Sequence, residues 1–596
     1  MAVKETDIQI AICGSAGDGT IAAGSILKHA MANAGYRVIA FDTYPAEIRG
    51  FGKCIARVRI TSEQVYSMKA QTDVLISLND GHAIPHVGEV RNFGSVIYES
   101  EPITDLAEGT HISGHVRPGQ IPYGLSIRGL SERATGANRS RNMVVLGFLA
   151  GLYKMPFDVF HEAITSKFGT RGKTIIENSI AAFDAGVEVA RESYRFDLVK
   201  LNDPPPRKVH EVSILTGNEA VVRGCLDAGI DMYFGYPITP ATTIMEGLAT
   251  ELPKRGKRML QTEDEIAAIS ATIGAGYAGV RAATATSGPG LALMTEMLGL
   301  GVMAEVPAVI FVSQRGGPST GMPTKTEQSD LNIAIYGGAG DAQRIVLAPT
   351  SVEGCYYCAG KAFEFAERFQ TPVIVLLDLY LSNRFESVMF SDDWSFNLDA
   401  GKRLQKQGNQ RYRRFEITRT GISPRAVPGQ AGGIHTATGL EHDEYGQPNY
   451  EPEVHSRMSE KRHDKLLRAL KHPDFINYKR FGDRGSVDVG LLAWGSTFGE
   501  VLEAMQLARR EGIRCAAMKV IMLSPLPVEP ISAFFDDCAE VLIPELNYEG
   551  QFANLISGAL GRSVHRLNRV TGSPMQVLEI LEAIRGLVAK QQRGVA

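Results

Sequence analysis

The sequence predicts a multidomain α/β protein, and three observations carry this prediction. First, its 596 residues are too many for one compact hydrophobic core, and chains of this length usually form several domains. Second, short apolar strands alternate with helical stretches through most of its length, the pattern of sheets covered by helices. Third, strands in the central stretch, such as PAVIFVSQ and PVIVLLDLYL, are separated by helices as in a doubly wound, mostly parallel sheet.

The N-terminal α/β domain is predicted over residues 1–190. Its expected strands are IQIAICG, YRVIAFD, TDVLISL and GSVIYES, and helical stretches such as IAAGSILKHAMANAG separate them. The alternation ends near three consecutive prolines, Pro204, Pro205 and Pro206. Because proline cannot continue a helix or a central strand, we predict a stiff linker over residues 191–209.

Two further α/β domains are predicted after the linker. The first spans residues 210–395 and contains the doubly wound sheet, whose ligands should bind at the carboxyl ends of its strands. The second is smaller and spans residues 486–596, where strand and helix patterns alternate again. Between them, residues 396–485 are polar, rich in Gly, Pro and His, and include the basic segment GKRLQKQGNQRYRR. We predict an excursion there that serves as a partner-docking arm.

Composition and charge exclude several classes of protein. The net charge of −4 results from 62 basic and 66 acidic residues, so no overall field would hold the chain on nucleic acid or on an anionic membrane. No apolar run is long enough to cross a bilayer, and the first residues, MAVKETDIQIAIC, lack the apolar core of a signal peptide. The seven cysteines are odd in number and scattered, as expected for free thiols in a reducing compartment. We therefore expect a cytoplasmic protein that binds a small ligand or a protein partner.

The first candidate site is a glycine-rich turn at the end of the first long strand. Gly14, Gly17 and Gly19 follow a strand and open a helix, where backbone N–H groups can surround an anion. The spacing does not match the dinucleotide-binding motif, and Asp18 places a negative charge where a phosphate would lie unless a metal intervenes. A simple tight turn from strand to helix explains the segment equally well.

The second candidate site follows the strand DMYFGYP. Thr239 is expected to be a helix N-cap and Pro240 the first helical residue, which explains both residues without a ligand. Alternatively, Tyr236 and Thr239 lie at a carboxyl strand end beside a positive helix terminus, an arrangement suited to a substrate carboxylate or carbonyl. Both interpretations stay open at this point.

The third candidate is Glu265, in the segment QTEDE before the small-residue helix IAAISATIGAGYAG. The three carboxylates of Glu263, Asp264 and Glu265 could merely complement the helix dipole. A single buried glutamate would also suit thiamine chemistry, because a carboxyl that hydrogen-bonds N1′ of the aminopyrimidine ring promotes loss of the thiazolium C2 proton. The neighbouring Ala and Gly residues would let a cofactor and a partner backbone come close.

The fourth candidate is Arg315, directly after the apolar strand PAVIFVS. Its guanidinium would lie at the carboxyl end of a central strand, beside a glycine-rich loop that carries Ser319, Thr320 and Thr324. Such a fork suits bidentate binding of a carboxylate. The alternative is a buried structural ion pair.

Cysteine and histidine pairs do not predict a metal site on this chain. Cys355 and Cys358 lie one turn apart on an expected helix, without the second pair that a zinc or iron–sulfur site needs. Two histidine pairs are interrupted by Pro or Gly and lack a third ligand; they are His82 with His86 and His111 with His115.

Several of these segments together resemble one family. YPITP, EDEIAAISATIGA, TATSGPGLALM and QRGGPSTGMPTKTEQSDL are similar to the α subunit of the 2-oxoacid:ferredoxin oxidoreductases. Residues 1–190 resemble the family's γ domain, fused ahead of the α part as in the 2-oxoglutarate-type members. ISPRAVPG, TGLEHDEYG and PELNYEGQ also match, so the resemblance covers nearly the whole chain. It implies a pyrimidine-binding domain for thiamine diphosphate over residues 210–395 and a transketolase-C-like domain over residues 486–596.

The resemblance also implies roles for single residues. The family's activating glutamate precedes a helix glycine by nine positions, a spacing that Glu265 and Gly274 have. Thr239, Arg315 and Thr324 would hold the carboxylate and carbonyl of a 2-oxoacid. The γ domain would help to form a coenzyme A site, although AGDG replaces the family's GGQG-like turn there, which weakens a phosphate role for that loop.

Two parts that the chemistry needs are missing from the sequence. The diphosphate of thiamine needs a GDG loop followed by a metal-ligating Asn, and the only GDG, Gly17 to Gly19, has no such Asn at a suitable distance. No ferredoxin-like cysteine run is present either. The resemblance therefore implies a separate β subunit that carries the diphosphate site, Mg²⁺ and a [4Fe-4S] cluster. It also implies an active site at the interface and an (αβ)2 heterotetramer that reduces ferredoxin.

The expected reaction is oxidative decarboxylation of 2-oxoglutarate with coenzyme A, which gives succinyl-coenzyme A, carbon dioxide and two electrons passed singly to ferredoxin. It could also run in reverse, as in a reductive TCA cycle. The distal carboxylate of this substrate needs a second cation, for which Lys325 or a partner residue is the candidate. A broad or branched-chain 2-oxoacid enzyme is the close alternative. A transketolase-like transferase and a non-catalytic binding subunit are the alternatives from other classes.

Overall fold

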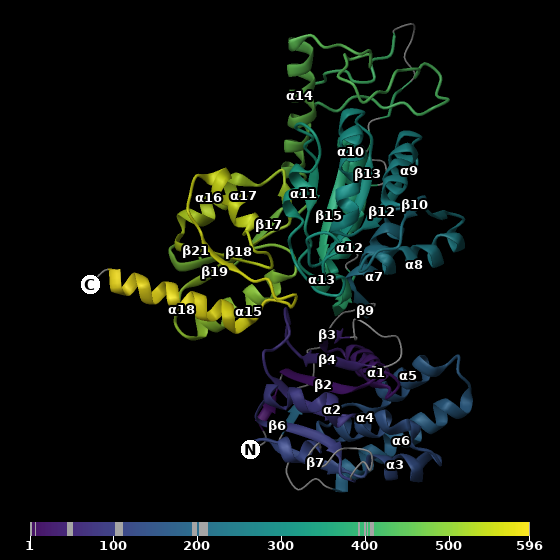
Figure 1. Ribbon diagram of the computed structural model, residues 1–596, viewed down its shortest axis with the longest axis vertical. Coiled ribbons are helices and arrows are strands. Elements are labelled where there is room, and N and C mark those ends of the chain that lie inside the picture. The colour runs from purple at the N-terminus through teal and green to yellow at the C-terminus, as the bar shows by residue number, and fades with distance from the viewer. Residues whose placement is uncertain are drawn as a thin grey trace. The chain divides into compact units, whose positions relative to one another are not determined.

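A computed structural model describes most of the chain and divides it into two compact units. The first unit contains Met1–Leu215 and Arg384–Phe390, and the second contains Thr216–Asn383 and Ser391–Ala596 (Figure 1). The predicted linker prolines and part of the basic segment lie outside the described residues. Described are residues 3–5, 7–43, 52–101, 111–192, 199–201, 212–390, 394–397, 401, 403–405 and 411–594.

The first unit is built on an eight-stranded sheet. In spatial order its strands are β7 (Ile121–Leu125), β6 (Val90–Glu99), β5 (Thr72–Ser77), β2 (Asp7–Ser15), β4 (Lys53–Thr61), β3 (Arg37–Thr43), β16 (Phe385–Met389) and β9 (Val212–Thr216). Strands β2, β5, β6 and β7 run parallel, whereas β4 is antiparallel to both β2 and β3. Two short strands, β1 (Val3–Glu5) and β8 (Val199–Leu201), pair with each other.

Helices cover both faces of this sheet. Along β2, Ile10 and Ile12 face a large hydrophobic core, whereas Ala11 and Cys13 face a smaller one, because successive side chains of a strand point to opposite faces. The helices of the large core are α1 (Thr20–Asn33), α4 (Arg141–Leu152), α5 (Phe157–Phe168) and α6 (Lys173–Glu192), with α3 (Ile127–Thr135) packed on α4 and α6. The smaller core lies under α2 (Asp80–Ala83) and the 3₁₀ helix η1 (Ile84–Glu89).

The second unit contains the doubly wound sheet that the sequence predicts. Six strands run parallel in the order β11 (Arg258–Gln261), β10 (Met232–Gly235), β12 (Ala282–Thr286), β13 (Ala308–Gln314), β15 (Pro372–Asp378) and β14 (Ile345–Leu347). Every residue of β13 and β15 is buried, as expected for parallel strands covered on both faces. The prediction of a doubly wound α/β domain is confirmed.

The helices of this sheet lie in two layers. One layer consists of α9 (Glu265–Tyr277), α10 (Gly288–Met303) and α11 (Leu331–Tyr336), which share a core with Ile310 of β13 and Ile374 of β15. The other contains α7 (Gly217–Asp227), α8 (Thr242–Glu251) and α12 (Val352–Phe369), and α7 packs against both α8 and α12. Right-handed crossovers explain this division, because the connection through α12 runs along the sheet in the opposite direction to those through α9 and α10.

The C-terminal part adds a five-stranded sheet. Its order is β17 (Tyr478–Gly482), β19 (Cys515–Val520), β18 (Val487–Ala493), β21 (Cys538–Glu545) and β22 (His565–Asn568), with β17 antiparallel and the rest parallel. Its helices are α15 (Thr497–Arg510), α16 (Val528–Asp536), α17 (Gln551–Leu560) and α18 (Val577–Gly594). The core of this sheet is continuous with the core under α9, α10 and α11. The C-terminal part therefore packs directly on the layer of α9, α10 and α11.

Some strands belong to a different sheet than their place in the sequence suggests. Strand β16 follows the short helix α13 (Leu379–Asn383) but pairs with β3 in the first unit. Strand β20 (Met522–Ser524) leaves the C-terminal part and pairs antiparallel with β14. Alternation of strands and helices along the chain does not reveal which sheet a short strand joins. The predicted domain boundaries at residues 190, 210, 395 and 485 stay predictions.

The polar excursion contains a helix that the sequence pattern did not predict. Residues 411–451 form turns and isolated bridges, and α14 (Pro452–Leu467) follows them. The inward face of α14 carries Lys461 and Lys465, both buried, and each binds the carboxylate of Glu305. Because this face is charged, apolar periodicity could not indicate the helix.

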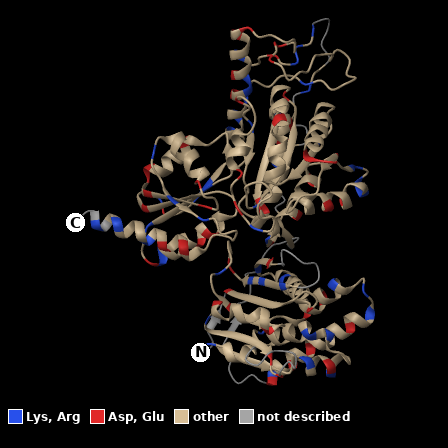
Figure 2. Cartoon of the chain, in the orientation of Figure 1, with Lys and Arg blue, Asp and Glu red and all other residues tan. Residues whose placement is uncertain are grey.

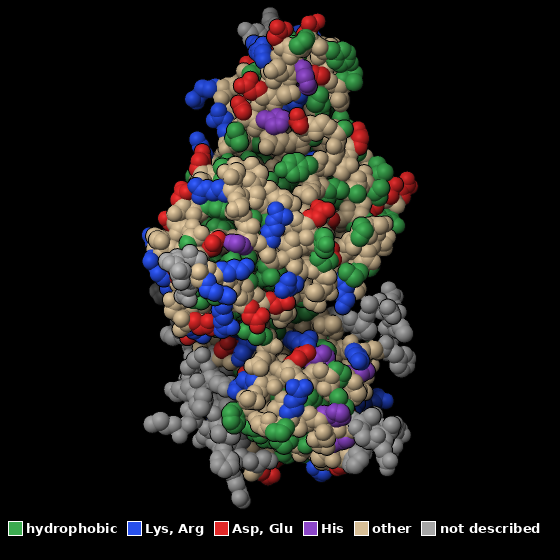
Figure 3. All heavy atoms as spheres, turned by 60° about the vertical axis from the view of Figure 1, so that its left-hand side comes forward, with side chains coloured by type: hydrophobic (Ala, Val, Ile, Leu, Met, Phe, Trp, Pro, Cys, Tyr) green, Lys and Arg blue, Asp and Glu red, His purple; other side chains and the backbone are tan. Residues whose placement is uncertain are grey.

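The surface mixes charges of both signs. Lys and Arg alternate with Asp and Glu over both units (Figure 2), and the face visible in Figure 3 shows hydrophobic side chains in small groups among them. This distribution agrees with the small net charge. Within the described ranges, no helix is both long enough and apolar enough to cross a membrane.

Candidate active site

The carboxyl ends of neighbouring strands bring the predicted residues to one edge of the parallel sheet. Thr239 follows β10, Glu265 follows β11, and Arg315 follows β13. Strand β12 lies between β10 and β13 and leads into α10, whose positive amino terminus points to the same edge. Parallel α/β sheets bind their ligands at this edge.

Glu265 is the first residue of α9 and is only 6% exposed. Its neighbour Asp264 is the N-cap and accepts a hydrogen bond from the backbone N–H of Ala267 at 2.7 Å, so the helix start is satisfied without Glu265. The Glu265 carboxylate extends to the first turn of α10, where a Cβ at Gly290 would stand 2.6 Å from Oε1. Glu263 is exposed. This arrangement favours a site role for Glu265 over a role in the helix dipole.

Several buried polar atoms near this edge lack a hydrogen-bond partner within the described part of the chain. They are Thr284 Oγ1 on β12, Ser287 Oγ at the start of α10, and Arg315 Nε. A buried polar group without a partner is costly, so each marks a place where a ligand atom or a water is expected. An aminopyrimidine ring carries both donors and acceptors, and the residues present fit the pyrimidine half of thiamine diphosphate.

Arg315 is held in place by backbone carbonyl groups. Its Nη1 donates to Thr239 O at 2.6 Å and its Nη2 to Thr320 O at 3.0 Å. Burial lowers the pKa of Arg315, and the nearby carboxylates of Asp330 and Glu265 act in the opposite direction. Since both carbonyl partners are neutral, these two hydrogen bonds do not neutralise the charge of Arg315, and its Nε has no partner among the described residues.

The loop over residues 315–330 has a fixed backbone. The N–H of Gly316 donates to Lys325 O at 2.9 Å, which closes the loop on itself. Gly321 has a φ of 54°, and a Cβ there would stand 1.9 Å from Gly316 O, so only glycine fits. The backbone of the loop therefore follows a defined path.

Two further predicted residues lie on this loop and face outward. Thr324 and Lys325 are exposed. The stem of Lys325 lies over Gly572 of the C-terminal part, where a Cβ would stand 2.8 Å from the lysine Cβ. Tyr236 is 39% exposed. The structure thus joins Thr239 with Arg315 by a hydrogen bond and leaves these three residues at the surface.

The expected helix cap at Thr239 is wrong. Helix α8 begins at Thr242, and the N–H of Thr242 donates to Ile238 O at 3.0 Å. Thr239 and Pro240 form a turn ahead of the helix. Because this turn occupies the position that a cap would need, the hydroxyl of Thr239 is not used to start α8, and its carbonyl serves Arg315 instead.

Sequence reasoning missed Gln328, which connects the loop to the C-terminal part. This fully buried side chain accepts from Thr497 Oγ1 at 2.8 Å and donates to Trp494 O at 3.1 Å. Its backbone N–H donates to Leu546 O at 2.8 Å, and its carbonyl accepts from Asn547 Nδ2 at 3.0 Å. All these partners are far away in sequence, so the sequence carries no local signal for them.

Sequence reasoning also missed Asp330, two positions later. Its Oδ2 is buried without a partner among the described residues, and a Cβ at Gly288 would stand 2.5 Å from both of its carboxyl oxygens. Burial raises the pKa of Asp330 to about 7; Glu327 acts in the same direction and Arg315 in the opposite one. The segment TEQSDL marks the neighbourhood, but nothing in it reveals this environment.

The N-terminal glycine turn is tightly packed. A Cβ at Gly14 would stand 2.2 Å from Thr20 Oγ1, and one at Gly19 would stand 2.3 Å from Asn142 Nδ2. Gly17 has open space around it and a φ of 103°. Asp18 folds into the turn, where it accepts from the backbone N–H of Ser15 at 2.7 Å.

The charge of Asp18 is also paired, since Arg141 Nη2 lies 3.2 Å from its Oδ1. These contacts give the turn a structural role that needs no ligand. An anion-binding role for Gly14, Gly17 and Gly19 stays a prediction.

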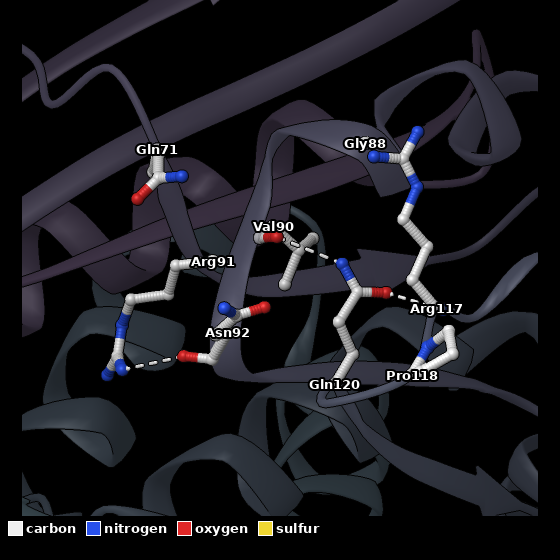
Figure 4. A pocket seen from close by; sticks show the side chains of 8 residues that line it. All are labelled: Gln71, Gly88, Val90, Arg91, Asn92, Arg117, Pro118 and Gln120. Carbon is white, nitrogen blue, oxygen red and sulfur yellow. Dashed lines mark hydrogen bonds between the residues drawn. The ribbon is translucent and has the colours of Figure 1, made fainter.

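A separate hollow of about 400 Å³ lies in the first unit, and Figure 4 shows its lining. Its walls come from the amino ends of β5, β6 and β7, so it lies at the opposite edge of the sheet from the glycine turn. Gln120 donates to Val87 O and Val90 O at 2.9 Å, and Arg91 pairs with Asp73. Two of its lining side chains, Gln120 and Arg91, are therefore already bonded within the protein.

The cysteine and histidine pairs have ordinary environments. Cys355 and Cys358 are buried free thiols on α12, and burial raises the pKa of Cys358 to about 12. His82 Nδ1 lies 3.1 Å from Gly14 O, and His86 Nδ1 lies 2.7 Å from Glu89. Across the described ranges, no group of three His, Cys, Asp or Glu residues is arranged for a metal ion.

Three parts of the chain match known families. Residues 9–189 match "Pyruvate ferredoxin/flavodoxin oxidoreductase", residues 223–461 match "Pyruvate flavodoxin/ferredoxin oxidoreductase, thiamine diP-bdg", and residues 487–580 match "Pyruvate:ferredoxin oxidoreductase core domain II". Fold and site together define the class of an oxidoreductase subunit with a thiamine-diphosphate-binding domain.

Individual relatives narrow this class. "2-oxoacid:ferredoxin oxidoreductase 2, subunit alpha" of Aeropyrum pernix is 32% identical over 98% of both chains. "2-oxoglutarate oxidoreductase subunit KorA" of Mycobacterium tuberculosis is 30% identical over 98% of this chain and 92% of its own. A solved structure, "2-oxoglutarate:ferredoxin oxidoreductase from Magnetococcus marinus with 2-oxoglutarate, coenzyme A and succinyl-CoA bound", has a TM-score of 0.91 and 36% identity, and the alignment covers 98% of this chain and all of that one. The chain belongs to the 2-oxoacid:ferredoxin oxidoreductase family, and the α-subunit names of its relatives imply a partner subunit.

Proposed function

We propose that the chain is the α subunit of a 2-oxoglutarate:ferredoxin oxidoreductase. In this reaction 2-oxoglutarate and coenzyme A give succinyl-coenzyme A, carbon dioxide and a proton, while two electrons pass singly to ferredoxin; the reverse direction would serve a reductive TCA cycle. The observation that carries the proposal is the placement of buried Glu265 and Arg315 at one edge of the parallel sheet. The names of the Magnetococcus marinus structure and the Mycobacterium tuberculosis relative support the substrate.

The residues of this chain would divide the work between cofactor and substrate. When bound, thiamine diphosphate supplies a carbon nucleophile and holds the electron pair left when carbon dioxide departs. Glu265 would hydrogen-bond N1′ of its pyrimidine ring, and burial of this carboxyl beside Gly290 excludes competing water. Arg315 would bind the 2-oxoacid carboxylate, with Thr239 and Thr324 near its carbonyl and Tyr236 at the rim. Lys325 would bind the distal carboxylate once it turns inward.

A β subunit would complete the site from the exposed side of α9, α10 and α11. Ile266, Leu293 and Tyr336 expose apolar side chains on these helices, and Gly274 has open space around its Cα, which lets a partner backbone approach. The β subunit would carry the diphosphate site, Mg²⁺ and the [4Fe-4S] cluster, and two such pairs would form an (αβ)2 assembly. Ile434, which is 93% exposed, would contact a partner as part of the docking arm of residues 396–485.

The N-terminal domain would help to form a coenzyme A site. The turn of Gly14, Gly17 and Gly19 is the candidate for its anionic groups, on condition that Asp18 stays paired with Arg141. A cytoplasmic location fits the free thiols of the seven cysteines.

The test is to purify the complex from its native cells and to measure its visible spectrum, thiamine content and dye reduction with several 2-oxoacids. We expect a brown complex with a smaller cysteine-rich subunit and coenzyme A-dependent activity on 2-oxoglutarate. Activity on pyruvate or branched-chain 2-oxoacids without activity on 2-oxoglutarate would identify a broad enzyme, which several relatives named only for 2-oxoacids favour. A colourless chain that is active alone with thiamine diphosphate would identify a transferase instead.

A further inference from the structure

We propose that Asp330 is a further residue of the substrate site, which binds a proton together with the 2-oxoacid anion held at Arg315. This inference rests on the proposed function and deepens it. It concerns a side chain that would not react with the substrate but would set how binding depends on pH. Asp330 is therefore a positioning residue, which acts on the substrate through Arg315.

The first argument is the position of the carboxyl group. Asp330 follows the loop that begins at Arg315, and its backbone N–H donates to Gln314 Oε1 at 3.0 Å. Both carboxyl oxygens lie against Gly288 in the first turn of α10. Although the residue as a whole is half-buried, its Oδ2 is buried and has no partner among the described residues. Burial without a partner favours the neutral carboxyl, whereas the positive amino terminus of α10 favours the carboxylate, so both forms are accessible to this group.

The second argument is the balance of charges. The carboxyl groups of Glu265 and Asp330 both act on the guanidinium of Arg315, and Glu327 acts on Asp330. Glu327 accepts from the backbone N–H of Gly317 at 3.3 Å and from a serine hydroxyl at 3.1 Å. Among the described residues, the carboxyl of Asp330 has no comparable donor. Burial and the neighbouring Glu327 both disfavour the ionised form of Asp330, so Asp330 is the carboxyl that binds the proton in this proposal.

The groups that face Asp330 can be named element by element. Arg315 and Glu327 come from the same loop as Asp330. Glu327 raises the pKa of Asp330, whereas Arg315 lowers it. Glu265 comes from α9 and acts on Arg315. The first turn of α10 and β13 contribute glycine and glutamine, and α17 contributes Gln551, which donates to Ser329 O at 2.8 Å; these groups do not titrate. Burial and Glu327 together raise the pKa of Asp330 to about 7.

The third argument is linkage. A substrate carboxylate at Arg315 adds a negative charge and neutralises the cation that opposes protonation, so Asp330 holds its proton more tightly in the complex. By reciprocity, the protonated form binds the substrate more tightly than the ionised form. The 2-oxoacid carboxylates do not titrate in this range. Above neutral pH, each substrate molecule would thus bind with uptake of a proton, which returns to solvent when the site empties.

The kinetic test compares KM for 2-oxoglutarate across pH in the purified αβ complex at saturating coenzyme A. In the unmodified complex we expect KM to rise at least about fivefold between about pH 6 and about pH 8.5, with kcat carrying little of the change. Asp330→Asn should give a KM that is low and nearly independent of pH, because the amide imitates the neutral acid. Glu327→Gln should move the inflection to lower pH, and Asp341→Asn, an exposed aspartate, should leave the profile unchanged. A pH profile that Asp330→Asn does not alter would overturn the proposal.

A second measurement does not depend on activity. Infrared difference spectra of the complex between about pH 6 and about pH 8.5 should show a carboxyl C=O band that Asp330→Asn removes and Asp341→Asn keeps. Thiamine content and melting temperature confirm that each variant is folded. If the band is present but no 2-oxoacid is oxidised, the proposed function fails while the titration of Asp330 stands. If 2-oxoacids are oxidised but the band is absent, the inference about Asp330 fails by itself.

Discussion

The carboxylate of Glu265 occupies the space that a side chain at Gly290 would need. A Cβ at Gly290 would stand 2.6 Å from Glu265 Oε1 and 2.0 Å from Thr286 Oγ1, and both are below any ordinary contact. Because Gly290 of α10 has no side chain, the carboxylate of Glu265 can lie in this space.

Gly290→Ala should displace Glu265 without unfolding the protein. Alanine favours a helix by about 1 kcal/mol over glycine, so the helix itself is not weakened, but the added methyl group must push the carboxylate aside. We expect a loss of thiamine diphosphate affinity and of activity, measured by cofactor titration and dye reduction in the assembled complex. Gly586→Ala is the matched control, since Gly586 lies within α18 with no atom in the way. Equal cofactor affinity in both variants would show that the position of Glu265 does not matter.

Glu265→Gln should abolish most of the activity while keeping the volume of the side chain. General acid–base assistance typically contributes about 100-fold or more to a rate, so kcat should fall by at least that factor. The control is Glu263→Gln, since Glu263 belongs to the same segment but is exposed; its kcat should stay near that of the unmodified complex. A fully active Glu265→Gln complex would support a non-catalytic role for the chain.

The sequence could predict the elements whose signal is apolar and local. Strands β13 and β15 are continuous apolar runs, and they are the buried centre of the sheet. The same local reasoning placed Arg315 at a carboxyl strand end, because a strand and the residue after it are adjacent in the chain. The choice of Glu265 over Glu263 needed a spacing taken from the family, and its burial agrees with that choice.

Features that depend on distant contacts could not be predicted in this way. Helix α14 buries Lys461 and Lys465 beside Met458 and Leu466, so its buried face is not a continuous apolar stripe. Strand β16 finds its partner β3 almost 350 residues earlier, as the hydrogen bond between Val38 N and Ser387 Oγ shows. Asp330 differs from an exposed aspartate only through the groups that fold around it. The prediction that Thr239 caps a helix is wrong because the chain makes one more turn before α8 begins.

Glu305→Gln should destabilise the packing of α14. The carboxylate of Glu305 is fully buried between Lys461 and Lys465, with Arg414 donating to Glu305 O at 2.7 Å. Removal of one partner of a buried charge cluster usually costs about 3–5 kcal/mol. Hydrogen exchange of the α14 amides should report this loss, and Glu453→Gln in the exposed first turn of α14 should not cause it.

Glu305 and two other carboxylates with basic partners predict how the stability of the protein responds to acid. Burial alone would raise the pKa of Glu305, but Lys461, Lys465 and Arg414 hold it well below its ordinary value. Burial opposes ionisation at Glu364 and Glu441 too, yet their basic partners lower each pKa to about 2. The unfolded chain binds these protons near pH 4.5, so the stabilisation is present above that pH and is lost as the pH falls towards 2. The protection factors of the α14 amides, which correct for the pH dependence of intrinsic exchange, should fall over this range, and less so in Glu305→Gln; an equal fall in both proteins would exclude Glu305 as a cause.

Gln328→Leu should detach the substrate loop from the C-terminal part. The substitution keeps a similar volume but leaves Thr497 Oγ1, Trp494 O and the N–H of Leu546 without their side-chain partner. Each buried polar group left unpaired costs about 1–3 kcal/mol, so we expect a lower melting temperature and a higher KM for 2-oxoglutarate.

The reason for the effect on KM is that Gln328 fixes the loop that starts at Arg315, whereas Glu265 belongs to α9 and does not depend on that loop. Affinity for thiamine diphosphate should therefore change less than KM for the 2-oxoacid. Gln447→Leu is the control, because Gln447 is exposed and its side chain donates to Thr436 Oγ1 at 3.1 Å within the arm. If Gln328→Leu weakens cofactor and substrate equally, Gln328 stabilises the whole second unit rather than the substrate loop.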